Sequence, residues 1–283
     1  MKNVIVGEHA GFCFGAARGV ESLEKALLED KPLYTYGPIL NNDMVVSDFS
    51  KRGVKVVNSV EELRNLPKGK VIIRSHGVPR KIYEALLDTG HEVFDATCPF
   101  VKRIHRIVEK ESSEGSQIVV IGNPAHPEVE GIVGWSVNGA TVIEEIKEAE
   151  EYKPLQGVKV CIVSQTTFNS NKFKELVEIF QKNSYNINVM NTICDATSIR
   201  QQEAAKMSQS VDVMIVIGDT KSSNSKKLYE ICRANCGNTF FIQTLSDIKG
   251  KLSNVSGVVG ITAGASTPKY IIEEVQNYVR NDF

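Results

Sequence analysis

The sequence predicts an α/β fold of three similar units with mainly parallel sheets, and a loose internal repeat is the first reason. Cys13, Cys98 and Cys194 are each followed by a helical pattern and, 24 positions later, by a glycine. Those glycines are Gly37, Gly122 and Gly218. In the second and third units an apolar run typical of a buried strand, 118–121 or 213–217, leads directly into the glycine. Strands that alternate with helices in this way are typical of parallel sheets.

The repeat divides the chain into predicted units 1–97, 98–193 and 194–283. Later in each unit a second apolar strand runs into a polar loop, and these loops are Ser75-His76-Gly77, Ser164-Gln165-Thr166-Thr167 and Thr262-Ala263-Gly264-Ala265-Ser266. Parallel sheets bind ligands at the carboxyl ends of their strands, so we expect the three units to surround one central site. The alternative is that the spacings coincide because βα units have similar lengths everywhere.

Length and charge favour a globular protein that binds a small ligand. With 283 residues, 42% of them hydrophobic, the chain is long enough to bury a sizeable core. Lysine and arginine number 33 against 34 acidic residues, which gives no sign of a surface that binds nucleic acid. The sequence predicts a small-molecule partner and no nucleic-acid partner.

Neither a signal peptide nor a membrane segment is expected. The early apolar stretch 4–6 is too short for a signal-peptide core, and no apolar run reaches membrane-spanning length. Without a secretory signal, the six cysteines are interpreted as thiols or metal ligands and not as a disulfide framework. We therefore expect a cytoplasmic protein.

The three anchor cysteines are candidate metal ligands because each precedes a predicted helix. Cys98 is followed by Pro99, a good first helical residue, and the other two precede the predicted helices 15–28 and 196–208. A helix N-terminus stabilises a thiolate by about 0.3–1 kcal/mol, and thiolates ligate metals. A buried structural cysteine would explain any one of them alone, but not three at equivalent places.

The other three cysteines are interpreted as structural. Cys161 lies inside the strand pattern 158–163, where a free cysteine behaves as a small hydrophobe. Cys232 and Cys236 are four apart on a helical segment, with no further ligands near them in sequence, and are expected to be core or surface thiols.

Wide separation of the three candidate ligands favours an iron–sulfur cluster over structural zinc. Zinc normally takes local Cys-x-x-Cys pairs, whereas Cys13, Cys98 and Cys194 lie 85 and 96 residues apart. Three cysteines on a cluster of four irons leave one iron without a protein thiolate, so that iron can bind a substrate oxygen as a Lewis acid. The sequence thus predicts an enzyme with a 4Fe-4S cluster.

Polar residues in the loops after the strands complete the candidate site. Glu128 could deliver protons and His126 precedes it, in a segment, 125–131, that is too polar and rigid for a simple helix start; a capped turn is the alternative. His76 stands at a strand end in a similar way. Hydroxyl and amide donors suited to a phosphate group are supplied by Ser222, Ser223, Asn224 and Ser266.

Seven ordered motifs resemble those of the 4-hydroxy-3-methylbut-2-enyl diphosphate reductase (LytB) family over essentially the whole chain. They are Gly11-Phe12-Cys13, Ser75-His76-Gly77-Val78, Asp95-Ala96-Thr97-Cys98-Pro99, His126-Pro127-Glu128-Val129-Glu130-Gly131, Gln165-Thr166-Thr167, Ser222-Ser223-Asn224-Ser225 and Thr262-Ala263-Gly264-Ala265-Ser266.

The resemblance implies a pseudo-threefold trefoil around a central 4Fe-4S site. It further implies two-electron reductive loss of the substrate's allylic hydroxyl, giving isopentenyl and dimethylallyl diphosphate in the last step of the non-mevalonate isoprenoid route. The three anchor cysteines would hold the cluster, Glu128 would supply protons and Thr166 would help to orient the hydroxyl end. The implied diphosphate ligands are His76, His126, Ser222, Ser223, Asn224 and Ser266, and the implied electron donor is reduced ferredoxin or flavodoxin.

One position departs from the family pattern. A histidine–asparagine pair is expected after the first unit's strand, and this chain has Asn41-Asn42. Asn41 can donate a neutral hydrogen bond but carries no charge, so we expect diphosphate binding to be weaker by up to roughly 1.5–3 kcal/mol.

Two other classes of protein fit parts of the pattern. Quinolinate synthases also combine three pseudo-symmetric domains with one cluster cysteine from each, but their motifs differ. A non-enzymatic iron–sulfur sensor would be expected to carry a nucleic-acid-binding segment or a partner helix. Turnover of a diphosphate substrate with a chemical reductant separates these classes from a reductase.

Overall fold

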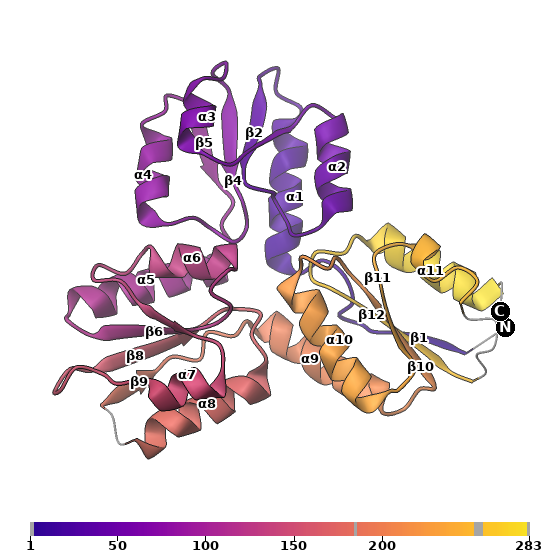
Figure 1. Ribbon diagram of the computed structural model, residues 1–283. Helices are drawn as coiled ribbons and strands as arrows, with labels where there is room; N and C mark the ends of the chain where they lie inside the picture. Colours follow the sequence, from indigo (N-terminus) through magenta and orange to yellow (C-terminus); the bar gives the residue numbers. More distant parts are fainter. Residues whose placement is uncertain (1–2, 184–185, 252–256, 282–283) are drawn as a thin grey trace. The chain divides into compact units, whose positions relative to one another are not determined.

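The computed structural model describes residues 3–183, 186–251 and 257–281, which form three four-stranded sheets with helices between the strands (Figure 1). Every strand pair in the three sheets is parallel. The predicted α/β class with three similar parallel units is therefore confirmed.

The first sheet along the chain has the strand order β3-β2-β4-β5. Its strands are β2 (Leu33–Tyr36), β3 (Lys55–Val57), β4 (Lys70–Ile73) and β5 (Glu92–Asp95). The helices of this part of the chain are α1 (Phe14–Ala26), α2 (Asp43–Lys51), α3 (Val60–Arg64) and α4 (Arg80–Leu87). Ser59 caps α3 by accepting the N–H of Glu62, as expected for a serine that precedes a helix.

The second sheet repeats this order as β7-β6-β8-β9. Its strands are β6 (Gln117–Ile121), β7 (Thr141–Ile143), β8 (Val160–Ser164) and β9 (Ile187–Val189), and its helices are α5 (Pro99–Ser113), α6 (Pro127–Val133), α7 (Ile146–Glu151) and α8 (Ser170–Lys182). Alternate residues of each central strand face opposite sides. Val119 and Ile121 pack with α8, while Ile118 and Val120 pack with α5 and α6.

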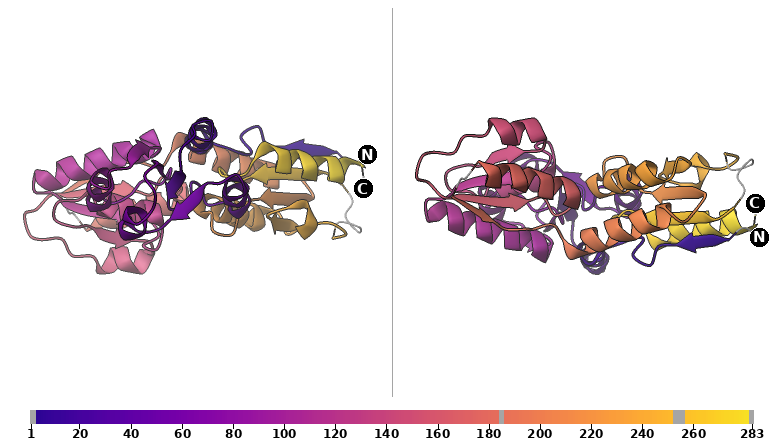
Figure 2. Two further views of the ribbon diagram at one scale, coloured as in Figure 1. Left: turned by 90° about the horizontal axis from the view of Figure 1, so that it is seen from above. Right: turned by 90° about the horizontal axis from the view of Figure 1, so that it is seen from below.

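The third sheet has the order β11-β10-β12-β1 and includes the first strand of the chain (Figure 1). Its strands are β1 (Val4–Val6), β10 (Val213–Ile217), β11 (Thr239–Ile242) and β12 (Val259–Ala263). Its helices are α9 (Asp195–Ser208), α10 (Ser223–Asn235), a 3₁₀ turn (Leu245–Asp247) and α11 (Lys269–Asn281). Helix α11 packs on one face of this sheet and α9 and α10 on the other (Figure 1), so the view from below in Figure 2 has α9 and α10 in front of the sheet.

Strand β1 occupies the place in the third sheet that β5 and β9 occupy in the other two. Each of these edge strands precedes one anchor cysteine, and each pairs with the strand that ends in the second polar loop, namely β12, β4 or β8. The boundaries at 97/98 and 193/194 stay predictions. The sheet order adds that residues 4–6 complete the third unit's sheet, because the repeat begins with the edge strand and not with the cysteine.

The repeated glycines lie where a side chain would not fit. A Cβ at Gly122 would lie 2.8 Å from Val129 on α6, and one at Gly218 would lie 2.2 Å from the hydroxyl of Ser225 on α10. Gly37 has a φ of +69°, which disfavours other residues. A glycine is therefore favoured at each of the three repeated positions.

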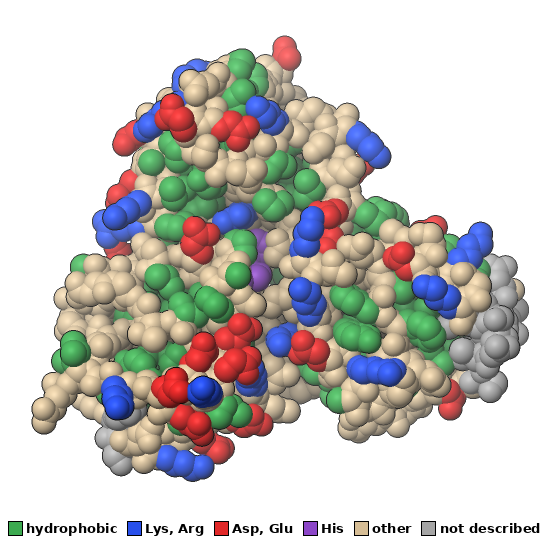
Figure 3. Space-filling model, in the orientation of Figure 1, with side chains coloured by type: hydrophobic (Ala, Val, Ile, Leu, Met, Phe, Trp, Pro, Cys, Tyr) green, Lys and Arg blue, Asp and Glu red, His purple; other side chains and the backbone are tan. Residues whose placement is uncertain are grey.

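Acidic and basic side chains are interspersed over the face shown in Figure 3, in keeping with the balanced composition. Among the described residues, no helix combines the length and the apolar character that crossing a membrane requires.

Candidate active site

The three anchor cysteines are held by equivalent backbone hydrogen bonds. The N–H of Cys98 donates to the carbonyl of Ser75 (2.9 Å), that of Cys194 to Thr166 (3.0 Å) and that of Cys13 to Ala265 (3.2 Å). Each acceptor lies two residues beyond the last residue of β4, β8 or β12. Each cysteine is partly exposed and stands at the start of α5, α9 or α1. The sequence repeat therefore reflects a structural repeat of the cysteine positions.

The remaining three cysteines are buried, as their structural interpretation requires. Cys161 lies in β8 and packs with α5, and Cys232 and Cys236 lie in the core between α10 and the third sheet. Burial raises the pKa of Cys161 and of Cys232 to about 12. These thiols are therefore poor metal ligands, unlike the partly exposed anchor cysteines.

Glu128 is a buried carboxyl at the start of α6, held at both oxygens by one threonine. Its Oε1 accepts the backbone N–H of Thr166 (2.6 Å), and its Oε2 accepts the Thr166 hydroxyl (2.9 Å). Only 2% of the residue is exposed. Desolvation raises the pKa of Glu128 to about 7, and the two hydrogen bonds offset only part of that rise. Glu128 can therefore both hold and release a proton near neutral pH.

His126 begins the helix that carries Glu128. Its Nδ1 accepts the N–H of Glu128 (3.1 Å), and Pro127 takes the first helical position. The expectation that this segment is too polar and rigid for a simple helix start was wrong, because the histidine side chain replaces the usual serine or aspartate cap. The hydrogen bond places the proton of the neutral imidazole on Nε2.

His76 lies against His126. The two rings meet edge to face, with centroids 5.3 Å apart. Burial lowers the pKa of His126 to about 4 and that of His76 well below its usual value, with nearby Arg74 adding to the effect in both. The buried Nδ1 of His76 has no hydrogen-bond partner among the described residues. A buried polar atom of this kind is a candidate ligand contact.

These contacts join two anchor cysteines through the predicted site residues. The N–H of Cys98 donates to the carbonyl of Ser75, and the ring of the next residue, His76, contacts the ring of His126. His126 accepts the N–H of Glu128, whose carboxylate accepts the N–H of Thr166. The carbonyl of Thr166 in turn accepts the N–H of Cys194. The sequence singled out all of these residues except Ser75 for chemistry. The structure thus places the predicted residues of the first two sheets in one continuous series of contacts.

His105 on α5 packs against this series of contacts, although it was not among the residues that the sequence indicated. It is buried on α5, and its ring stacks on Trp135 with centroids 5.2 Å apart. A Cβ at Gly77 would lie 2.8 Å from the ring, so His105 packs closely against the loop that carries His76. Its apolar period with Val101 and Val108 on α5 is the sequence signal that could have indicated burial.

A second group of predicted residues gathers around the third sheet. Ser266 donates its hydroxyl to the carbonyl of Asn41 (3.2 Å), and its own carbonyl accepts the side-chain amide of Asn42 (2.8 Å). The Asn42 oxygen accepts the N–H groups of Met44 and Val45 and so caps α2. Asn42 is therefore structural, and it locks the position of Asn41 beside Ser266.

The start of α10 carries the serines and the asparagine that the sequence indicated. Ser222 caps the helix by accepting the N–H of Ser225 (3.3 Å). Asn224 is buried, and neither its amide nitrogen nor its amide oxygen has a hydrogen-bond partner among the described residues. Asp219, which sequence reasoning missed, joins this loop to α2 by accepting the N–H of Asp43 and that of Lys221.

Comparison with known proteins gives one consistent result. The family model described as LytB protein matches residues 4–280. The chain is 42% identical to the 4-hydroxy-3-methylbut-2-enyl diphosphate reductase of Caldanaerobacter subterraneus subsp. tengcongensis, covering 98% of this chain and 96% of that protein. It is 38% identical to the reductase of the same name from Clostridioides difficile, covering 99% of both chains.

Solved structures agree with the relatives. The E-1-hydroxy-2-methyl-but-2-enyl-4-diphosphate reductase from Plasmodium falciparum is similar with a TM-score of 0.93 and 27% identity, over 99% of this chain and 88% of that one. A second solved structure, titled as the terminal enzyme of the non-mevalonate pathway, has 40% identity and a TM-score of 0.69 over 99% of both chains. The resemblance that the motifs carried is confirmed: this chain belongs to the LytB family.

Proposed function

We propose that the chain reduces 4-hydroxy-3-methylbut-2-enyl diphosphate to isopentenyl and dimethylallyl diphosphate, the last step of the non-mevalonate isoprenoid route. The substrate loses its allylic hydroxyl as water and takes up two electrons and two protons. The observation that carries the proposal is Glu128, a fully buried carboxyl whose pKa of about 7 suits proton transfer. Relatives named 4-hydroxy-3-methylbut-2-enyl diphosphate reductase match nearly the whole chain. This similarity favours a reductase over a quinolinate-synthase-like enzyme or an iron–sulfur sensor.

Cys13, Cys98 and Cys194 are the proposed ligands of a 4Fe-4S cluster. Each is partly exposed, stands at a helix start that favours a negatively charged ligand, and has its own N–H already bonded to a loop carbonyl. The other cysteines are buried in the core. When bound, the cluster would supply electrons and an iron that polarises the bond between the substrate's carbon and hydroxyl oxygen.

Glu128 is the proposed proton donor at the hydroxyl end of the substrate. With its pKa raised to about 7 by burial, the residue can give a proton and regain one near neutral pH. Thr166 fixes both oxygens and so holds the carboxyl in one orientation. Burial of Glu128 limits the access of bulk water to its proton.

The diphosphate is the proposed partner of buried polar side-chain atoms for which the described part of the chain supplies no hydrogen-bond partner. The amide nitrogen of Asn224 and the Nδ1 of His76 fit this role as donors, because burying an unpaired polar group is costly unless a ligand pairs it. His126, Ser222, Ser223, Ser266 and Asn41 are the further proposed ligands. Since burial keeps His76 and His126 neutral in the free protein, we expect their protonation to accompany binding of the anion.

Reduced ferredoxin or flavodoxin is the proposed electron donor, by similarity to the family. A chemical reductant can replace it in a test of the chain's own residues. The proposed location is the cytoplasm, and no nucleic-acid or membrane partner is proposed.

The test is anaerobic purification with iron and sulfide analysis, followed by Mössbauer spectroscopy with and without the substrate. The proposal expects about four irons and four sulfides per chain, one iron whose signal changes on adding substrate, and turnover with a chemical reductant. Replacing Cys13, Cys98 or Cys194 by serine should lower the iron content, whereas Cys161→Ser, the matched buried control, should not. Zinc, or equal iron content in all four variants, would overturn the ligand assignment.

A further inference from the structure

Helix α9 holds the loop that leads to Cys13. Arg200 of α9 is 3% exposed, and its guanidinium donates to two carbonyls of that loop. Its Nε donates to the carbonyl of His9 (2.8 Å) and its Nη2 to the carbonyl of Gly11 (2.9 Å). The second acceptor lies two residues before the cysteine.

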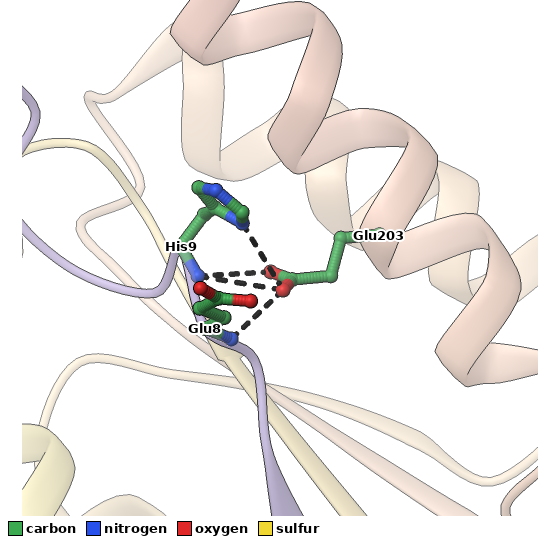
Figure 4. A group of neighbouring side chains, drawn as sticks. All are labelled: Glu8, His9 and Glu203. Atoms are coloured by element: carbon green, nitrogen blue, oxygen red, sulfur yellow. Dashed lines mark hydrogen bonds and ion pairs between the residues drawn. The ribbon is translucent and has the colours of Figure 1, made fainter.

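Glu203, one turn further along α9, accepts hydrogen bonds from the same loop, whereas Arg200 donates to it (Figure 4). Its carboxylate accepts the N–H of Glu8 (2.8 Å), the N–H of His9 (3.2 Å) and the His9 ring nitrogen Nδ1 (3.2 Å). A Cβ at Gly7 would lie 2.7 Å from Glu203, so glycine there permits this close approach. One helix therefore satisfies both the donors and the acceptors of residues 8–11.

Glu8, His9 and Glu203 lie close enough together to resemble a metal site. Both oxygens of Glu203 already accept N–H groups, and Glu8 and His9 are exposed. These hydrogen bonds satisfy the carboxylate oxygens without a cation. The group is better explained as a clamp on the backbone than as a metal centre.

We propose that Arg200 and Glu203 are positioning residues for Cys13. The loop has few bonds of its own, since Ala10 donates to Gly7 and Cys13 to Ala265, while Gly11 has a φ of +101°. A flexible loop would leave the thiolate with many orientations, and charge-assisted hydrogen bonds from a rigid helix remove that freedom. The role of the clamp in holding a cluster ligand rests on the proposed function. The clamp itself does not, because its effect on Cys13 can be measured in protein without iron.

The helix that carries the clamp begins at Asp195, the residue after Cys194. The same rigid element therefore follows one proposed ligand and fixes the backbone of another. Burying a guanidinium is costly unless its hydrogen bonds are satisfied, so a packing role alone would be served better by an apolar side chain.

The test uses Arg200→Met, Arg200→Lys and Glu203→Gln, with Lys206→Met as the control. Lys206 is exposed on the same helix, so its replacement removes a long cationic side chain that does not hold the loop. In cluster-free protein, the rate of alkylation of each cysteine is followed by mass spectrometry. We expect Cys13 to react about tenfold faster in Arg200→Met, with a smaller rise in Arg200→Lys and Glu203→Gln, and Cys98 to react at the unchanged rate.

In cluster-loaded protein, the half-time of cluster loss to an iron chelator is then compared. The same variants should lose the cluster several-fold faster, in the same order, while the control matches the unaltered protein. Unchanged alkylation of Cys13, or an equal rise at Cys98, would overturn the clamp. Faster alkylation with unchanged cluster loss would overturn its role toward the cluster. If the unaltered protein binds no cluster, the proposed function fails, and the alkylation rates still decide the clamp.

Discussion

Thr166 donates two hydrogen bonds to Glu128, one from its backbone N–H and one from its hydroxyl, so that each carboxyl oxygen accepts one. The pair joins β8's loop to the start of α6 inside the protein. Both bonds favour the ionised carboxyl, yet burial outweighs them and the pKa rises to about 7. The proton on Glu128 is thus controlled by two opposing effects that can be changed separately.

The raised pKa of Glu128 makes stability depend on pH in a predictable direction. The unfolded carboxyl titrates near 4.5 and the folded one near 7, so between these values the folded state binds a proton that the unfolded state has lost. The free energy of unfolding should therefore fall as pH rises through this window, by about 1–3 kcal/mol. In Glu128→Gln this fall should be absent.

The measurement is urea unfolding of the two cluster-free proteins at several pH values between 4.5 and 8. Buried histidines have lowered pKa values and contribute the opposite slope, but they are present in both proteins and cancel in the difference. Parallel curves for the two proteins would show that Glu128 titrates normally.

Thr166→Val should move the pH dependence of turnover. The hydroxyl of Thr166 lowers the pKa of Glu128 by donating a hydrogen bond to the carboxylate. The variant keeps the backbone N–H but loses this hydroxyl, so the pKa of Glu128 should rise. We expect the pH above which turnover falls to rise by somewhat under about one unit, because a single hydrogen bond contributes roughly 1 kcal/mol. Thr166→Ser, which keeps a hydroxyl, is the control and should retain the original profile. An alkaline limit that is the same in all three proteins would contradict proton delivery by Glu128.

Asn224→Ala should separate binding from stability. The free protein loses only an unpaired buried amide, so its unfolding free energy should not decrease, while affinity for inorganic diphosphate should fall about tenfold. Asn42→Ala is the matched contrast, because Asn42 caps α2 and bonds to Ser266. That variant should be destabilised by about 0.5–2 kcal/mol. Calorimetric titration and urea unfolding give both quantities, and a destabilised Asn224→Ala protein with normal affinity would refute the assignment.

Asn41→His should strengthen diphosphate binding. The backbone of Asn41 is already fixed by Ser266, so the change adds a side chain that can carry charge without moving the loop. A gain of roughly 1.5–3 kcal/mol corresponds to about tenfold to a hundredfold in the dissociation constant. The gain should be larger at pH 6 than at pH 8, as protonation of a histidine requires. Asn41→Gln serves as the neutral control, and equal affinities for all three would contradict the charge argument.

Much of the fold followed from the sequence because its signals are local. Val119 and Ile121 alternate with Ile118 and Val120 across β6, and this buried pattern predicts a strand covered on both faces. Cys13, Cys98 and Cys194 mark equivalent positions because each follows an edge strand and begins a helix.

What the sequence did not reveal depends on pairing between distant residues. Asp219, Arg200 and Glu203 are polar residues whose partners lie far away in sequence, so no spacing rule connects them. His126 was misjudged for a different reason, since a histidine that caps a helix is uncommon and its role depends on which ring nitrogen is protonated. Local pattern thus indicated candidate site residues, but not the distant residues that hold their loops in position.

The pairing of β1 with β12 has a consequence for how the chain folds as it is synthesised. Val4 lies opposite Val259, so β1 is synthesised long before the strand with which it pairs. The sheets β2–β5 and β6–β9 contain all their strands before residue 190 and can form earlier. A circular permutation that placed residues 4–6 after α11 would reduce the sequence separation between β1 and β12. It should therefore speed the slowest folding step.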